Sequence, residues 1–291
     1  MDRIASPIPR SSRNDGAGTP PAHWLRLCRR ALPLAAAIFL GACASTAPNG
    51  RSQLTVSEPF STLYSSLDLS LTLSAQPTIA DSCVGIQCQV DKGFERQVVR
   101  LGNRLAASAY AAYPDLKERV PKFSFIVAEK IDGGSSSDAS GTIVIYRGVR
   151  NAPVDEEALA YLIAEEMAHV IARHHDEKSA ATVISSLVAQ VLLAPANLAG
   201  GVALIASTIA TAIGKDLITT DNVPEQREEA DTIALDLLSK QGWSQTEIAD
   251  SLLDYSNRLG ESLWSAEVKR TVARLNIHKP ADTLALAQLA Y

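Results

Sequence analysis

Residues 165–169 read Glu-Glu-Met-Ala-His, one substitution away from the zinc-binding sequence His-Glu-x-x-His. In that sequence, two histidines four residues apart lie on one face of a helix and bind zinc through neutral imidazole nitrogens. The glutamate between them takes a proton from the metal-bound water. Glu166 stands at the position of this base and His169 at that of the second histidine, whereas Glu165 replaces the first histidine.

The residues around the motif predict a buried amphipathic helix. Asp155 is a suitable N-cap, and apolar residues follow it at helical spacing. Two strand-like runs, 123–127 and 142–146, precede this helix. A second helix is expected to begin near Pro224 and to end at Gly242.

This order of elements, with Glu229-Ala-Asp231 in the first turns of the second helix, resembles the HtpX-type and CaaX-prenyl-protease zinc metallopeptidases (family M forty-eight, gluzincins). The resemblance covers about residues 93–260. It implies a mainly α fold of the α+β class, a gluzincin-like helical domain with a small β-sheet beside the motif helix. It also implies zinc-dependent endopeptidase chemistry with Glu166 as the base.

The metal-ligand positions depart from the family twice. The resemblance places the third zinc ligand four residues before Asp231, where this chain has Arg227. A guanidinium has no lone pair to offer a metal. One neutral ligand has thus become an anion, Glu165, and one anionic ligand a cation. We therefore predict that Glu165, Arg227 and Asp231 form an ion pair in the cleft in place of the metal.

Two alternatives remain open at this point. A solvent-exposed pair between the arginine and the aspartate, four residues apart on one helix, would explain both residues and would leave His169 as a core histidine without metal. Alternatively, Glu165 and His169 bind zinc in an atypical site, because carboxylates are acceptable zinc ligands. The third ligand would then be Glu228 or Glu225.

Three neighbouring segments carry further expectations. His174 and His175 follow the motif helix and are expected at the surface, where imidazolium suits the negative end of the helix dipole. Residues 133–141 consist of Gly, Ser, Asp and Ala, a composition typical of a flexible loop. The resemblance implies a Ser/Thr-His-Pro run before the last helix, but the nearest residues here are Ser265-Ala266-Glu267.

The N-terminus predicts export and a lipid anchor. Residues 1–30 carry six arginines, residues 31–40 are apolar, and Leu40-Gly-Ala-Cys43 resembles a bacterial lipobox. Residues 1–42 are therefore expected to be a signal peptide, with Cys43 as the lipid-bearing residue of an outer-membrane lipoprotein facing the periplasm. A plain secretory signal or a short membrane anchor is the alternative. The apolar run is too short to span a bilayer, which takes about 20 residues.

The rest of the chain is expected to form a tether and one domain. Residues 43–92 are predicted to be a tether, with a local disulfide between Cys83 and Cys88 in the oxidising periplasm. A metallopeptidase-like domain is expected over residues 93–280. Residues 179–214 contain no charged residue and no histidine, which is typical of an apolar helical hairpin. Such a hairpin would be buried, form a subunit contact, or act as a lid or membrane-facing patch.

Composition narrows the choice of function. The net charge is −5 for the whole chain and near −9 without residues 1–42, which argues against nucleic-acid binding. The expected partners are envelope proteins or peptides, and the membrane through the lipid anchor. The sequence favours a degenerate metallopeptidase-like lipoprotein that has lost zinc-dependent catalysis, needs no cofactor and binds protein clients. The alternative is an active zinc metalloendopeptidase with an atypical Glu/His metal site in envelope protein quality control.

Overall fold

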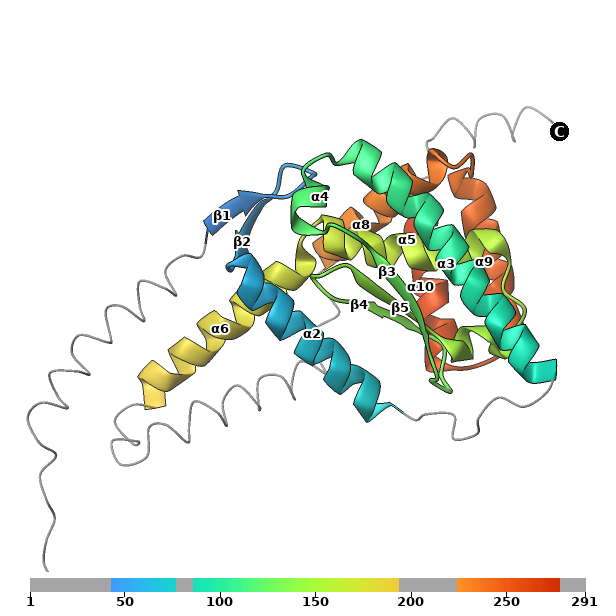
Figure 1. Cartoon of the computed structure of the whole chain (residues 1–291), viewed down its shortest axis with the longest axis horizontal. Coiled ribbons are helices and arrows are strands. Elements are labelled where there is room, and N and C mark those ends of the chain that lie inside the picture. The colour runs from blue at the N-terminus through green and yellow to red at the C-terminus, as the bar shows by residue number, and fades with distance from the viewer. Residues whose placement is uncertain (1–42, 77–85, 194–223, 278–291) are drawn as a thin grey trace, which may run out of the picture. The chain divides into compact units, whose positions relative to one another are not determined.

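The computed structural model of the chain describes residues 43–76, 86–193 and 224–277 (Figure 1). All of the described residues belong to one compact unit. The described part is mainly helical with two small sheets, which confirms the predicted α+β class. Its helices are α2 (Glu58–Ala75), α3 (Ile86–Ala112), α4 (Leu116–Arg119), α5 (Glu156–Ile171), α6 (His174–Leu193), α8 (Pro224–Ser239), α9 (Gln245–Arg258) and α10 (Leu263–Ile277). Its strands are β1 (Cys43–Thr46), β2 (Ser52–Thr55), β3 (Ser124–Ala128), β4 (Ser135–Ser137) and β5 (Thr142–Tyr146), and a 3-10 helix spans Arg147–Asn151.

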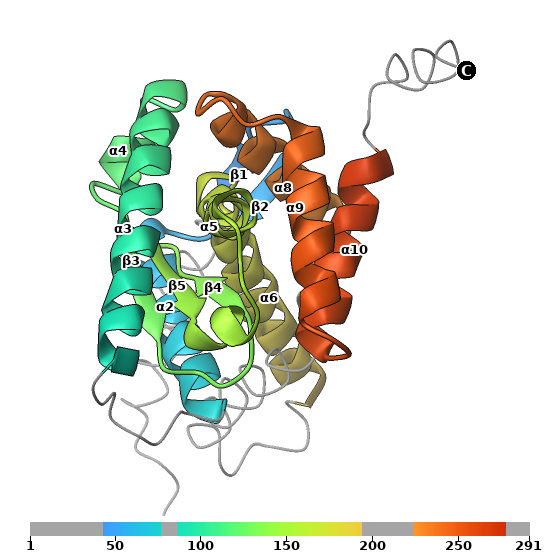
Figure 2. The ribbon, with the colours of Figure 1, turned by 90° about the vertical axis from the view of Figure 1, so that its right-hand side faces the viewer.

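The motif helix α5 lies at the centre of the core. Figure 2 shows it end-on, with α3 on one side and α9 and α10 on the other. Leu159, Ile163 and Met167 are fully buried on α5, as their helical spacing predicted. The helix follows Asp155, whose backbone is extended as in an N-cap. Its carboxylate pairs with Arg258 instead of accepting a hydrogen bond from the helix backbone.

The larger sheet has the strand order β3-β5-β4, with β3 parallel and β4 antiparallel to β5. Ile143 and Ile145 on one face belong to the main core, while Val144 and Tyr146 on the other face pack against Leu69 of α2. The predicted flexible loop 133–141 is therefore partly wrong, because Ser135–Ser137 form the edge strand β4. Pairing with β5 stabilises a serine run that has little strand propensity of its own.

Residues 43–76 form a β-hairpin and a helix, whereas the sequence predicted a tether over residues 43–92. β1 pairs with β2 in an antiparallel hairpin, and α2 follows it. Helix α3 begins at Ile86, before the expected start of the domain. The α2 helix covers one face of the sheet, so this N-terminal segment belongs to the folded body.

Several sequence predictions lie partly outside the described residues. The disulfide prediction involves Cys83 at a position that is not described, and the part of the apolar segment beyond residue 193 is not described either. Residues 179–193 belong to α6. Helix α8 begins at Pro224, and Gly242 follows it with a positive φ of 93°, as predicted. Among the described helices, none is long and apolar enough to cross a membrane.

Candidate functional site

The residues of the degenerate motif line a cavity of about 500 Å³. Glu165, Glu166 and His169 reach it from α5, and Arg227 reaches it from α8. The edge strand β4, α2, α6 and α10 complete its walls. The structure thus brings together four residues that the sequence singled out, from two helices separated by more than 50 residues.

The loop before β4 closes one side of this cavity. Gly133 and Gly134 precede the strand, and a Cβ atom added at either position would overlap the ring of Trp264 or of Tyr146, respectively. Gly133 therefore lets Trp264 of α10 approach the loop closely, and Gly134 leaves room for the ring of Tyr146 of β5.

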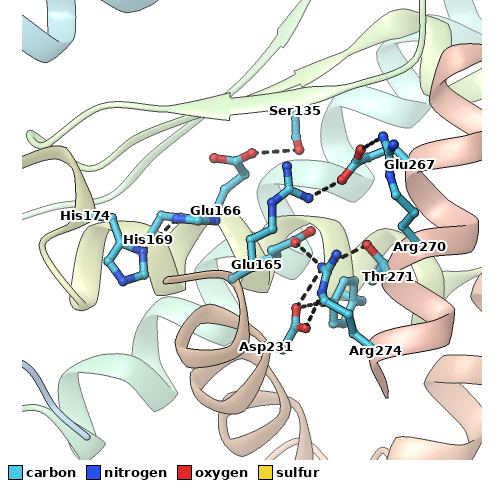
Figure 3. Close-up of polar contacts among 12 residues, drawn as sticks. Ser135, Glu165, Glu166, His169, His174, Asp231, Glu267, Arg270, Thr271 and Arg274 are labelled. Carbon is cyan, nitrogen blue, oxygen red and sulfur yellow. Dashed lines mark hydrogen bonds and ion pairs between the residues drawn. The ribbon is translucent and has the colours of Figure 1, made fainter. Parts of the chain in front are cut away.

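Glu166, at the position of the family's catalytic base, fastens the edge strand to the motif helix (Figure 3). Its Oε1 accepts a hydrogen bond from Ser135 Oγ at 2.8 Å, and its Oε2 accepts one from Ser137 Oγ at 2.6 Å. The single hydroxyl proton of Ser137 is used in this bond, so His175 Nε2, at 2.9 Å, donates to Ser137. Both carboxylate oxygens of Glu166 are thus already committed to protein donors.

Glu165 lies in a group of two acids that share one arginine, Arg274 of α10. Arg274 Nε is 2.7 Å from Asp231 Oδ2, and its Nη2 is 3.2 Å from Asp231 Oδ1 and 3.4 Å from Glu165 Oε1. Tyr161 donates its hydroxyl to Asp231 Oδ1 at 2.6 Å. The side chain of Asp231 is 2% exposed and that of Glu165 is 16% exposed, so these charges are largely removed from water. A guanidinium fork between two buried carboxylates is the arrangement that relieves their repulsion.

Arg227 is engaged with a different acid. Its Nη1 donates to Glu267 Oε1, and Arg270 donates to the other oxygen of Glu267. Burial opposes ionisation of Glu267, but the hydrogen bonds from the two arginines outweigh it and lower the pKa of this carboxyl below its usual range. Glu267 belongs to the Ser265-Ala266-Glu267 run, the nearest counterpart of the family's Ser/Thr-His-Pro run, and lies within α10.

His169 is linked to the buried acid Glu229 through His174. His174 Nδ1 lies 2.8 Å from His169 Nδ1, and His174 Nε2 lies 3.3 Å from Glu229 Oε2. Burial lowers the pKa of His174 to about 4, so the ring is neutral at pH 7. One neutral assignment satisfies both contacts: His174 donates from Nε2 to Glu229 and accepts at Nδ1 from His169.

An arginine from the N-terminal hairpin completes this chain of contacts. Arg51 forms a bidentate pair with Glu177, at 2.7 and 2.9 Å, and its Nη2 reaches Glu229 Oε2 at 3.0 Å. The side chain of Glu229 is 1% exposed, so Arg51 supplies the positive charge that makes burial of this acid tolerable. The hairpin thus supports the position of His169 through Glu229 and His174.

Replacing Arg51 with alanine is expected to lower the free energy of unfolding by about 2–4 kcal/mol, because Glu229 would remain buried without its cation. Denaturant unfolding followed by circular dichroism measures this effect. The matched control is Arg100→Ala, whose ion pair with Glu156 is exposed and should be worth about 0.2–1 kcal/mol. Equal losses in the two variants would contradict the role given to Arg51.

The raised pKa of Glu165 should make the stability of the protein depend on pH. Burial and the charge of Asp231 raise the pKa of Glu165 from 4.5 to about 8, although Arg274 and Arg227 oppose the shift. Because its pKa is raised in the folded state, its contribution favours folding most below pH 4.5 and is lost as the pH rises towards 8. Relative to a Glu165→Gln variant, the native chain should lose on the order of 1–3 kcal/mol of unfolding free energy across this interval. Parallel pH profiles for the two proteins would contradict the assignment.

The structure corrects three predictions about the site. The arginine within ion-pair distance of Glu165 and Asp231 is Arg274, and not Arg227 as predicted. Arg227 acts on the pKa of Glu165 through its charge. The alternative of a solvent-exposed pair is wrong for Asp231, because this residue is buried. His174 and His175 are not surface residues at the end of α5. His174 is 4% exposed and His175 bonds Ser137, because the chain turns sharply at Arg173 (φ 65°) and starts α6.

Comparison with known protein families identifies the family of the chain. Residues 95–276 match the model of peptidase family M48. The chain belongs to this family. The matched segment spans α5, α8 and α10, and therefore the whole arrangement around Glu165 and Arg227. No curated protein matches the chain.

The residues present do not fit the zinc site of this metallopeptidase family. His169 has the chemistry of a ligand, because the tautomer that donates from Nδ1 leaves Nε2 as an acceptor. At the first ligand position, however, Glu165 is shared with Arg274 and Asp231, and at the third position Arg227 is bonded to Glu267. An arginine offers no lone pair, and Glu225 and Glu228, which we considered as substitutes, are exposed on α8.

Proposed function

We propose that this M48-family protein has lost zinc-dependent peptide hydrolysis and uses the family cleft to bind protein clients. The observation that carries the proposal is the pair of arginine-centred contacts at the family's metal-ligand positions, Arg274 with Glu165 and Arg227 with Glu267. These contacts place positive charge where the family has a metal ion. Glu166 supports the same conclusion, because both its oxygens accept hydrogen bonds from β4.

The geometry of the cleft suits an extended polypeptide. Among the strands of the described residues, β4 is an edge strand that pairs with β5 alone, and it borders the cavity. An exposed strand edge can pair with an added strand through main-chain hydrogen bonds. Trp264 and Leu162 supply apolar surface in the same cavity for a client side chain. The client class is therefore an unfolded or extended protein segment.

The cellular location is part of the proposal. The apolar run 31–40 and the Leu40-Gly-Ala-Cys43 sequence support export and lipid attachment at Cys43. The clients would then be envelope proteins facing the periplasm, and residues 1–42 would be removed from the mature chain.

The test is to incubate the purified protein with reduced, carboxymethylated casein, an unfolded polypeptide. We expect saturable binding by fluorescence anisotropy and no cleavage products on a gel. Trp264→Ala should weaken binding by about tenfold, because it removes a large apolar contact from the cavity. Leu263→Ala, a neighbouring residue that is 92% exposed, is the matched control and should bind as the native chain does.

Two results would contradict this function. Casein cleavage that Glu166→Gln abolishes would show an active peptidase. Absence of casein binding, or equal binding by the two variants, would remove the cleft as a client site.

A further inference from the structure

Helix α2 buries a mixed side, with Tyr64 and Leu69 among polar residues, and turns a row of apolar residues towards solvent. Four large side chains on the outer side are exposed, namely Phe60 (36%), Leu63 (62%), Leu67 (51%) and Leu71 (43%). Steps of three and four residues place them in one line along the helix. This set is called the outer stripe below. Single exposed leucines are ordinary, but an apolar stripe that follows one helix face indicates an interaction surface.

The inner side of α2 is held by polar contacts that fix the orientation of the helix. Ser66 Oγ donates to Asp138 at 2.9 Å, and Lys178 pairs with Asp68 at 3.0 Å. Ser61 is fully buried and donates to the carboxylate of Asp176. Rolling the helix to bury the outer stripe would break all of these bonds. The stripe is therefore a stable external feature of this fold.

The outer side of α2 also lacks charge. After Glu58, the exposed positions of the helix hold only apolar residues, serine and alanine. The one other charged residue of the helix is Asp68, which pairs inwards with Lys178. A surface of this kind binds through apolar contact rather than through attraction to charged groups.

The pairing of the hairpin places the stripe next to the attachment point of the N-terminal apolar run. Cys43 pairs with Thr55 across β1 and β2, and Thr55 lies three residues before the start of α2. Paired residues on antiparallel strands have Cα atoms about 4.5–5.5 Å apart. The apolar run 31–40 ends three residues before Cys43 in the sequence. The chain therefore enters the described fold beside the first turn of α2, where the outer stripe begins.

From this juxtaposition we propose that the outer stripe binds a lipid surface, with α2 lying in the plane of the interface and its leucines among the acyl chains. The inner side of the same helix remains a wall of the cleft, through Leu69 and Thr72. Clients would thus be bound next to the membrane. This proposal rests on the proposed function only for the lipid anchor at Cys43. The outer stripe itself would bind a lipid surface without that anchor.

The experiment uses the mature chain of the proposed lipoprotein, residues 43–291, with Cys43→Ser so that no lipid is attached. Flotation with vesicles of uncharged phosphatidylcholine and phosphatidylethanolamine measures the partition coefficient. We expect the protein to float with the vesicles at low and at high salt alike. Leu63→Ser combined with Leu67→Ser should reduce the partition coefficient at least about tenfold, because two apolar side chains leave the interface.

The control variant is Leu263→Ser on α10, where the side chain is 92% exposed but lies outside the stripe; it should bind vesicles as the parent does. Thermal unfolding checks that each variant is folded. Three results would overturn the proposal: a parent that stays in solution, equal flotation of parent and double variant, or a parent dimer that the double variant lacks. The last result would assign the stripe to a second copy of the chain. Casein binding is a separate readout, so failure of client binding and failure of lipid binding are distinguishable.

Discussion

Arg274→Ala should destabilise the protein by about 3–5 kcal/mol, because it leaves the buried carboxylate of Asp231, beside Glu165, without its cation. Arg274 is the shared partner of Asp231 and Glu165, and the side chain of Asp231 is 2% exposed. The free energy of unfolding from urea titration near neutral pH measures the loss. The loss should grow as the pH rises through about 8, where Glu165 ionises and adds a second buried charge beside Asp231.

The matched control for this variant is Arg270→Ala. Arg270 also lies on α10 and pairs with Glu267, but its side chain is 67% exposed, so its removal should cost no more than about 1 kcal/mol. Arg274→Lys should fall between the two, since an ammonium keeps the charge but cannot fork between two acids. A cost for Arg274→Ala as small as that of Arg270→Ala would show that the cation does not organise this site.

The double substitution Glu165→His with Arg227→Glu should create a zinc site where the native chain has ion pairs. The introduced imidazole would lie four residues before His169 on α5, and the introduced carboxylate would project from α8 into the same cavity. These are the donor types and spacing of the family's zinc ligands. The metal-free double variant should be less stable than the native chain, because Glu267 would lose one cation and face a new anion.

We expect this double variant to bind one zinc ion per chain and to be stabilised by it, by about 2.7 kcal/mol when free zinc is 100 times the dissociation constant. Elemental analysis and thermal unfolding with added zinc test both points. Adding His169→Ala to the double variant should abolish the stabilisation by zinc, and zinc should not stabilise the native chain. A double variant that unfolds at the same temperature with and without zinc would mean that the backbone no longer holds the ligand positions in register.

Local patterns in the sequence were sufficient for the central elements. The apolar run 142–146 coincides with β5, whose two faces are covered by different helices. The helical spacing around the motif correctly predicted α5, and Pro224 and Gly242 correctly indicated the two ends of the α8 region. These elements are set by periodicity and by end signals within a few residues, which a sequence shows directly.

The missed features depend on contacts between distant segments. Nothing near Arg274 indicates that it will meet Glu165, 109 residues earlier in the chain; only the packing of α10 brings them together. The serines of β4 have a loop-like composition and form a strand because β5 and Glu166 bind them. His174 was expected at the surface because it follows the motif helix, but the turn at Arg173 directs it inwards to His169. The outer stripe of α2 could have been predicted, because its leucines recur at helical spacing in the sequence. We predicted that segment as a tether.

The central claim is that arginines and their acids occupy the positions that hold zinc in the M48 family. The most direct measurement is the zinc content of the purified native chain by elemental mass spectrometry after dialysis against micromolar zinc. We expect far less than one zinc per chain, with no change in Glu165→Ala. One zinc per chain, lost in both Glu165→Ala and His169→Ala, would contradict it and would assign a working metal site to this cleft.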